Sequence, residues 1–153
     1  MLTNRRLPSD VQSLWIAFFI FALLLTIAPL AQGADSIDRR ISGQWKFIAA
    51  LDGAEIVALD EHEAQKLIGH IFLISKRKVK FDDRDCGETE FAAQKVEPNL
   101  HLRKAFHADA EKLGLPNPVT VVDLSCTSVF IKGANRLVIA WQGWFFEAVR
   151  VKH

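Results

Sequence analysis

The sequence predicts a mainly β protein, a small antiparallel β-barrel or strongly curved sheet with one or two short helices, after an N-terminal signal helix. Three observations predict this fold class. Short apolar stretches alternate with polar residues at a period of two, as half-buried strands do. Turn-forming dipeptides such as Asp52-Gly53 separate many of these stretches at hairpin spacing. Only two stretches, 60–67 and 99–113, place apolar residues at helical spacing.

The first 33 residues have the pattern of an export signal. Two arginines precede an uncharged apolar core at 14–30, and the small residues Ala31 and Gly33 favour cleavage before Ala34. The core is about as long as the shortest helix that spans a bilayer, so an uncleaved membrane anchor is the alternative. The basic flank precedes the core in either case, which predicts that residues 34–153 form one periplasmic or secreted domain.

The charge of the expected mature domain is balanced. The whole chain has 19 Lys and Arg against 18 Asp and Glu, and removing the leader leaves equal numbers of each. A neutral domain lacks the basic surface that a nucleic-acid duplex requires, so no nucleic-acid partner is expected. Contact with a membrane is expected only through the N-terminal segment, if that segment is not cleaved.

The chain has two cysteines, Cys86 and Cys126. In an oxidising compartment a single pair with no cysteine left over predicts one disulfide. Closing a loop of this length stabilises a fold by about 4 kcal/mol in the chain-entropy model. A redox or nucleophilic role is the alternative, but there is no Cys-x-x-Cys motif and no neighbouring His.

The domain opens with a half-buried strand over 43–51, in which Trp45 and Phe47 share one face. The Asp-Gly pair that follows is a hairpin signal, so 55–59 is expected to be the returning strand. A helix is expected over 60–67, because an Asp at its start and a Glu three residues later form a capping-box pattern and a Gly follows.

A second hairpin is expected next, with arms at 70–74 and 79–81. Its tip is strongly basic, and an acidic run at 82–90 follows around Cys86. The basic residues either keep an exposed turn soluble, contact an anionic partner such as a cell-envelope polymer or an acidic protein face, or pair with the acidic run. These candidate contact residues are Lys76, Arg77, Lys78 and Lys80.

A longer helix is expected over 99–113, with Asn99 as its N-cap and Gly114 at its end. The rest of the chain has the pattern of strands separated by turns. The remaining strands are expected at 91–96, 119–124, 129–131, 137–141 and 144–151.

The last strand, 144–151, is apolar on both faces, because Phe146 and Ala148 lie on one face while Phe145 and Val149 lie on the other. A helix, a partner chain or a ligand should therefore cover the second face. Closing the strands into a barrel would remove both sheet edges. The alternative is an open sheet with the 99–113 helix packed across it.

The Gly43-x-Trp45 motif at the start of the first strand, together with Arg150 near the end of the last, resembles the lipocalin-like (calycin) barrels. In that family a Gly-x-Trp opens the first strand and a basic residue of the last strand packs over the Trp. A cation–π contact is a physical reason for such a pair. The resemblance implies a small exported β-barrel that binds a ligand in its interior.

Several dense aromatic positions either line a ligand pocket or fill the core. These candidates are Trp45, Phe72, Trp141, Trp144 and Phe146.

No motif points to catalysis, a metal or a cofactor. The five histidines have no HxH or HExxH spacing, and no Gly-x-Ser-x-Gly elbow is present. An acid pair for hydrolysis would be recognisable only in space, and the carboxylates considered for one are Asp52, Glu55, Asp123 and Glu147. An enzyme is therefore not favoured.

The sequence predicts an exported, non-catalytic binding protein. Its partner is either a small apolar ligand held in the interior or an envelope protein held by an exposed loop such as 75–90, as in a lysozyme-inhibitor-like module. An internal cavity would favour the carrier, and a filled interior with exposed apolar residues would favour the interaction module. Two carboxylates facing each other across a cleft would favour a hydrolase.

Overall fold

The structure is a computed structural model that describes residues 32–152. The predicted signal segment therefore lies almost wholly outside the described residues. Gly33–His153 form one compact unit. Within the described range, no helix combines the length and the apolar character that crossing a bilayer requires.

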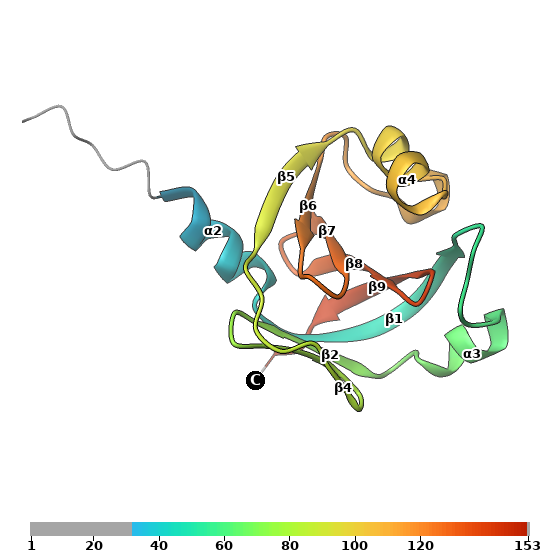
Figure 1. Cartoon of the computed structure of the whole chain (residues 1–153), viewed down its shortest axis with the longest axis horizontal. Coiled ribbons are helices and arrows are strands. Elements are labelled where there is room, and N and C mark those ends of the chain that lie inside the picture. The colour runs from blue at the N-terminus through green and yellow to red at the C-terminus, as the bar shows by residue number, and fades with distance from the viewer. Residues whose placement is uncertain (1–31, 153) are drawn as a thin grey trace, which may run out of the picture. The chain divides into compact units, whose positions relative to one another are not determined.

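The fold is mainly β, as the sequence predicts, and its strands form one antiparallel sheet that curls into a half-barrel (Figure 1). The order across the sheet is β4-β3-β2-β1-β9-β8-β7-β6-β5. The strands are β1 (Gly43–Gly53), β2 (Ile71–Ser75), β3 (Lys78–Phe81), β4 (Arg84–Asp85), β5 (Ala92–Val96), β6 (Val119–Asp123), β7 (Ser128–Gly133), β8 (Arg136–Trp141) and β9 (Trp144–Arg150).

The first and last strands, β1 and β9, pair with each other at the centre of the sheet. Every other pair of neighbouring strands is also consecutive in the sequence, and the only consecutive strands of the described residues that do not pair are β4 and β5. β1 pairs with β9 from Trp45 opposite Arg150 to Gly53 opposite Trp144, with two register shifts that increase curvature. The sheet therefore has a gap between β4 and β5, which the described residues do not join by strand pairing.

The gap is closed by side chains. The predicted Cys86–Cys126 disulfide is present, with the two Cα atoms 5.9 Å apart, and it links the segment after β4 to the β6–β7 loop. The hydroxyls of Thr89 and Ser125 are 3.1 Å apart at the same place. The curved sheet is therefore covalently linked across its open side.

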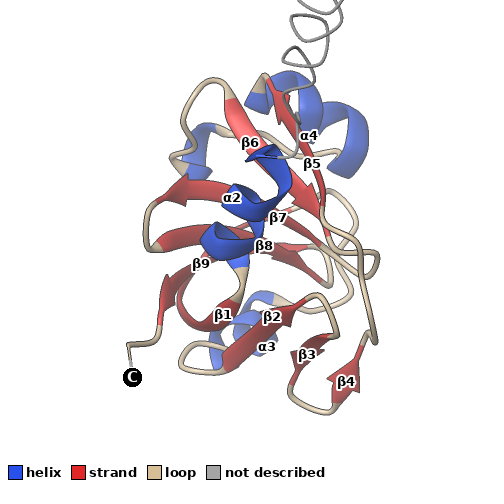
Figure 2. Cartoon of the chain, turned by 90° about the vertical axis from the view of Figure 1, so that its left-hand side faces the viewer, coloured by secondary structure: helices blue, strands red, loops and turns tan. Residues whose placement is uncertain are grey.

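Within residues 32–152, three helices and one 3₁₀ turn accompany the sheet: α2 (Gln32–Ile41), α3 (Glu61–Lys66), α4 (Pro98–Phe106) and η1 (Glu111–Leu113). α2 lies against the side of the sheet that faces the viewer in Figure 2, and Ile41 at its end is fully buried. α3 begins with the predicted capping box, in which Asp60 Oδ1 accepts from Glu63 N at 2.7 Å and Glu63 Oε2 accepts from Asp60 N at 2.9 Å.

The predicted 99–113 helix is wrong in its extent and its cap. α4 ends at Phe106 because His107 adopts a left-handed conformation (φ 50°), and the N-cap is Glu97, whose carboxylate accepts from Asn99 N and Leu100 N. The amide oxygen of Asn99 instead accepts from Ala110 N at 3.2 Å. The break divides the expected helix into α4 and η1, and each places a leucine in the same core.

The predicted 55–59 strand is also wrong. β1 does not turn at the Asp-Gly pair but continues to Gly53 in pairing with β9. The following residues form a loop that lies against the β8–β9 turn, since Ala54 N donates to Gly143 O at 2.8 Å and Ala58 N donates to Gln142 O at 3.1 Å. Tertiary pairing with β9 overrides the local turn signal here.

Two apolar cores pack on opposite faces of the sheet. The inner core joins residues of β2 and β3 with residues of β6 and β7, strands far apart in the sheet order, so it fills the concave side. The outer core packs Leu102 of α4 and Leu113 of η1 against Phe130 and Phe145. A helix therefore covers the second face of the last strand.

Candidate functional site

The five candidate aromatic residues belong mainly to the inner core, and of them Trp141 also lines an open depression. Trp45, Phe72 and Phe146 are fully buried, Trp141 is 5% exposed, and Trp144 is half-buried against the same cluster. Their role as core residues, one of the two interpretations of the sequence, is the one that the burial supports.

Rings in direct contact occupy the concave side. Phe47 stacks on Phe146 with ring centroids 4.5 Å apart and on Phe81 at 4.8 Å. Trp141 meets Phe81 and Phe72 edge-on, with centroids 5.2 and 5.4 Å away. These are ordinary contact distances for aromatic pairs in a packed core. An apolar ligand would have to displace several of these rings to enter.

Arg150 fastens α2 to the end of the sheet, in the position that the sequence motif suggests. Its guanidinium carbon lies 4.3 Å from the Trp45 ring centroid. The same guanidinium donates to the carbonyl oxygens of Ser42 at 2.5 Å and Arg40 at 2.6 Å. A Cβ at Gly43 (φ 139°) would lie 2.6 Å from Arg150 Nη1, so only glycine fits there. This set of contacts is a structural clamp.

The basic turn, residues 76–80, is largely neutralised by its surroundings. Lys76 forms an ion pair with Asp38 of α2, and Lys78 Nζ lies 3.3 Å from Asp85 Oδ2. Lys80 is half-buried and stands opposite Asp85 in the β3–β4 register. The open depression beside the turn, about 410 Å³, is lined by Lys76, Arg77, Glu88, Thr89 and Glu90. The predicted contact residues therefore do not form a surface of one charge.

Asp85 is held in its charged form at this turn. The backbone N–H of Gly87 donates to Asp85 Oδ1 at 2.9 Å, and this bond is the main cause that lowers the pKa of the carboxyl below its ordinary 3.8. The Lys78 ammonium lowers the pKa further, through a hydrogen bond and its charge. The carboxylate therefore offsets the charge of the basic turn over the whole physiological pH range.

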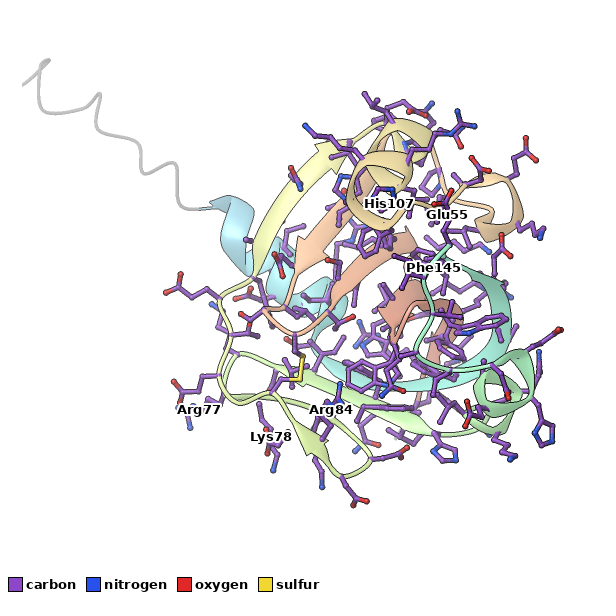
Figure 3. The ribbon with its side chains drawn as sticks, turned by 45° about the vertical axis from the view of Figure 1, so that its right-hand side comes forward. Glu55, Arg77, Lys78, Arg84, His107 and Phe145 are labelled. Atoms are coloured by element: carbon purple, nitrogen blue, oxygen red, sulfur yellow. A yellow bond between two sulfur atoms is a disulfide. The ribbon has the colours of Figure 1, made fainter. Side chains whose placement is uncertain are left out.

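A different charged segment, which we name the acidic loop (residues 54–63), lies at the opposite end of the sheet (Figure 3). Besides the two bonds to the β8–β9 turn, Glu55 N donates to His107 O at 3.2 Å, and Trp144 Nε1 donates to Leu59 O at 2.9 Å. A Cβ at Gly143 (φ 86°) would lie 2.7 Å from Val57 Cα. The loop backbone is thus held in one conformation by its neighbours.

The side chains of the acidic loop face solvent. Ile56 is 83% exposed and Val57 41%. Between Asp52 and Lys66 there is no Lys or Arg. The exposed carboxylates of the loop are Glu55, Asp60, Glu61 and Glu63.

An open cleft of about 420 Å³ lies between the acidic loop and the end of α4. Arg103 Nη2 is 2.9 Å from Asp109 Oδ1, and Asp52 Oδ1 is 3.1 Å from the Lys112 ammonium. Glu55 and His107 lie side by side at this cleft (Figure 3), and their side chains form no hydrogen bond or ion pair within the described part of the chain. The cleft can therefore accept a cationic group at Glu55.

Of the four carboxylates considered for an acid pair, Asp52 and Glu55 line the same open cleft beside α4, whereas Asp123 and Glu147 lie elsewhere. Asp52 is paired with Lys112, and Asp123 lines a second open depression, of about 380 Å³, which also includes Trp141 and Cys126. Glu147 is buried on the outer face, where Arg136 Nη1 and Lys132 Nζ donate to it at 2.7 and 3.2 Å. Among residues 32–152 no cluster of three or more His, Cys, Asp or Glu side chains is arranged to hold a metal ion.

The acidic loop was not among the sites proposed from sequence. Its signal was present as a run of carboxylates without a cation, interrupted by Ile56-Val57. The same apolar pair contributed to the wrong strand at 55–59, which would have buried these residues.

No protein-family model, curated protein or solved structure matches this chain.

Proposed function

We propose that this chain is an exported, non-catalytic interaction module that binds a partner protein of the cell envelope through its surface. The observation that carries the proposal is the packed interior, where Phe47 contacts both Phe146 and Phe81 and leaves the aromatic candidates in the core. A carrier for a small apolar ligand needs that volume to be open. The adjacent side chains of Ile56 and Val57 are both exposed and are available for such a contact.

Export is part of the proposal, and the disulfide across the sheet gap supports it. A disulfide of this kind is stable in a periplasm or outside the cell. The test is expression of the full chain in a bacterium, followed by intact-mass analysis of the periplasmic fraction. We expect a mature chain that begins at Ala34 and has no free thiol. A chain that stays in the cytoplasm with two free thiols would contradict export.

The interior is tested by titrating the folded protein with a fluorescent fatty acid. We expect no saturable binding and no quenching of the buried Trp45 and Trp141, because the rings leave no room. Stoichiometric binding with quenching would overturn the interaction-module proposal.

Such binding would instead support the second candidate, an interior carrier of the calycin type. The Arg150–Trp45 contact is the specific observation that favours this alternative, because the resemblance implies that pairing.

A further inference from the structure

We infer that the acidic loop, 54–63, is a docking surface for a cationic protein, with Ile56 as the apolar anchor. The inference rests on the proposed function and names the surface and the chemistry of the partner. Ile56 has the largest exposed fraction among the large apolar side chains that the structure describes, at 83%, and Leu100 follows at 69%. Leu100 lies on α4, without a comparable run of carboxylates around it.

The backbone that presents Ile56 is rigid. Residues on both sides of it are hydrogen-bonded to other elements, through Ala54 to Gly143, Glu55 to His107, and Ala58 to Gln142. Val57 packs at the Gly143 backbone, where no Cβ fits. A loop already fixed in one conformation loses little conformational entropy on binding, so more of the contact energy appears as affinity.

The charges around this anchor select the partner. Four exposed carboxylates lie in the loop and the first turn of α3, where Asp60 and Glu63 also form the capping box. Glu55, which lines the neighbouring cleft, has no cationic partner among the described residues. A partner with an apolar recess bordered by Lys or Arg would bury Ile56 and pair with these carboxylates. A lysine or arginine side chain of that partner fits the chemistry of the cleft beside Glu55.

The same charges disfavour other occupants. A symmetric contact between two copies would bring the same carboxylates against each other. An anionic membrane surface would be repelled in the same way. The basic turn of a second copy is a poor partner, since Lys76 and Lys78 are already paired with Asp38 and Asp85.

The first test measures binding of the full mature protein to three cationic probes, lysozyme, cytochrome c and ribonuclease A, by interferometry at about 50 mM and about 300 mM salt. We expect saturable binding to at least one probe, weakened about tenfold by Ile56→Ser. Leu100→Ser is the matched control for an exposed apolar residue and should change the Kd by less than about twofold. Failure of all three probes to bind at low salt would overturn the inference.

The second test removes carboxylates from the acidic loop with the double variant Glu55→Gln, Glu61→Gln. Its matched control is the double variant Glu88→Gln, Glu90→Gln, which removes two carboxylates beside the basic turn. The first pair should weaken binding about five- to tenfold and flatten its salt dependence, and the control pair should do neither. These exposed substitutions leave the apolar cores intact. Equal losses in both pairs would show that binding follows net charge and would reject the acidic loop as the site.

Photo-crosslinking in the periplasm separates this inference from the proposed function. A photoreactive residue is placed at position 56, 77 or 100 of the full chain. A protein adduct at 56 but not at 77 or 100 is the expected result. An adduct at 77 alone would keep the interaction module and reject the acidic loop. Absence of any adduct, together with fatty-acid binding in the interior, would reject both.

Discussion

The two ends of the curved sheet carry charges of opposite sign and use them differently. The basic turn stands near α2, at the end where Gly43 pairs with Ile74, and the acidic loop follows Gly53 at the other end. At the basic turn each of Lys76 and Lys78 has a carboxylate partner. In the acidic loop, Glu55 has no cationic partner among the described residues, and Ile56 is exposed beside it.

The comparison shows that a run of like charges does not by itself mark a binding surface. Asp38 comes from a helix distant in sequence, and Asp85 comes from the next strand, so folding supplies the counterions of the basic turn. Folding supplies the acidic loop with backbone anchors, but among the described residues Glu55 gains no cationic partner. A binding surface needs charges that remain available after folding, next to a fixed apolar contact.

The largest expected effect comes from removing the disulfide with Cys86→Ser and Cys126→Ser. The bond closes a separation of 40 residues across the gap. Its loss should lower the free energy of unfolding by about 2–4 kcal/mol. Hydrogen exchange should accelerate at the backbone amides of position 86 and Thr89, which donate to the carbonyls of Val79 and Lys76, while the Ala58 amide at the other end keeps its protection. Equal acceleration at both ends would contradict the view that they are held independently.

Arg150→Ala should give the next largest loss, about 2–3 kcal/mol in urea unfolding, because it removes the ring contact and leaves the Ser42 and Arg40 carbonyls without their donor. Arg150→Lys keeps the charge but not the planar pair of donors, so its free energy of unfolding should lie between those of the wild type and Arg150→Ala. Because α2 supplies the partner of Lys76, the alanine variant should also loosen the basic turn. A lysine variant as stable as wild type would show that the clamp is only electrostatic.

The sequence was sufficient to predict much of the fold, because those features depend on local chemistry. The alternation around Trp45 and the capping box at Asp60 depend only on residues nearby in the sequence. The two cysteines have only each other as a disulfide partner. The two apolar faces of β9 predicted a cover, and α4 supplies it.

The errors arose where a distant segment decides the outcome. The Asp52-Gly53 pair has the composition of a turn, but pairing with β9 continues β1 through Gly53. The helical stripe runs on to Leu113, but the Asn99–Ala110 bond and the left-handed His107 break it. The ion pair between Lys76 and Asp38 also depends on a helix distant in sequence, so the sequence pattern alone does not reveal it, and the basic turn as a contact surface stays a prediction.

Gly143→Ala tests whether the acidic loop depends on a fixed backbone. The new Cβ would meet Val57 Cα and Ile56 O, at 2.7 and 2.8 Å, and neither backbone atom moves without displacing the loop. We expect a loss of about 2–3 kcal/mol and slower, weaker partner binding.

The matched control for that change is Gly87→Ala beside the basic turn. Gly87 also has a positive φ, of 72°, but nothing lies within 4 Å of its Cβ position. The Gly87→Ala variant should lose about 1 kcal/mol of unfolding free energy and keep its affinity for the partner. If the two variants bind equally well, the fixed conformation of the acidic loop does not contribute to recognition.

The smallest effect concerns the pH response of the basic turn. Since the pKa of Asp85 is lowered chiefly by the Gly87 N–H, an NMR titration of its carboxyl should give a midpoint below 3.8. Lys78→Ala should recover only part of the difference, since it removes the smaller cause. A carboxyl with a lowered folded pKa stabilises the native state above its ordinary pKa, and that contribution is lost as the pH falls through the lowered value. The turn should therefore keep its internal pairing at neutral pH, and a midpoint at or above 3.8 in the wild type would mean that Asp85 does not offset its charge as the structure indicates.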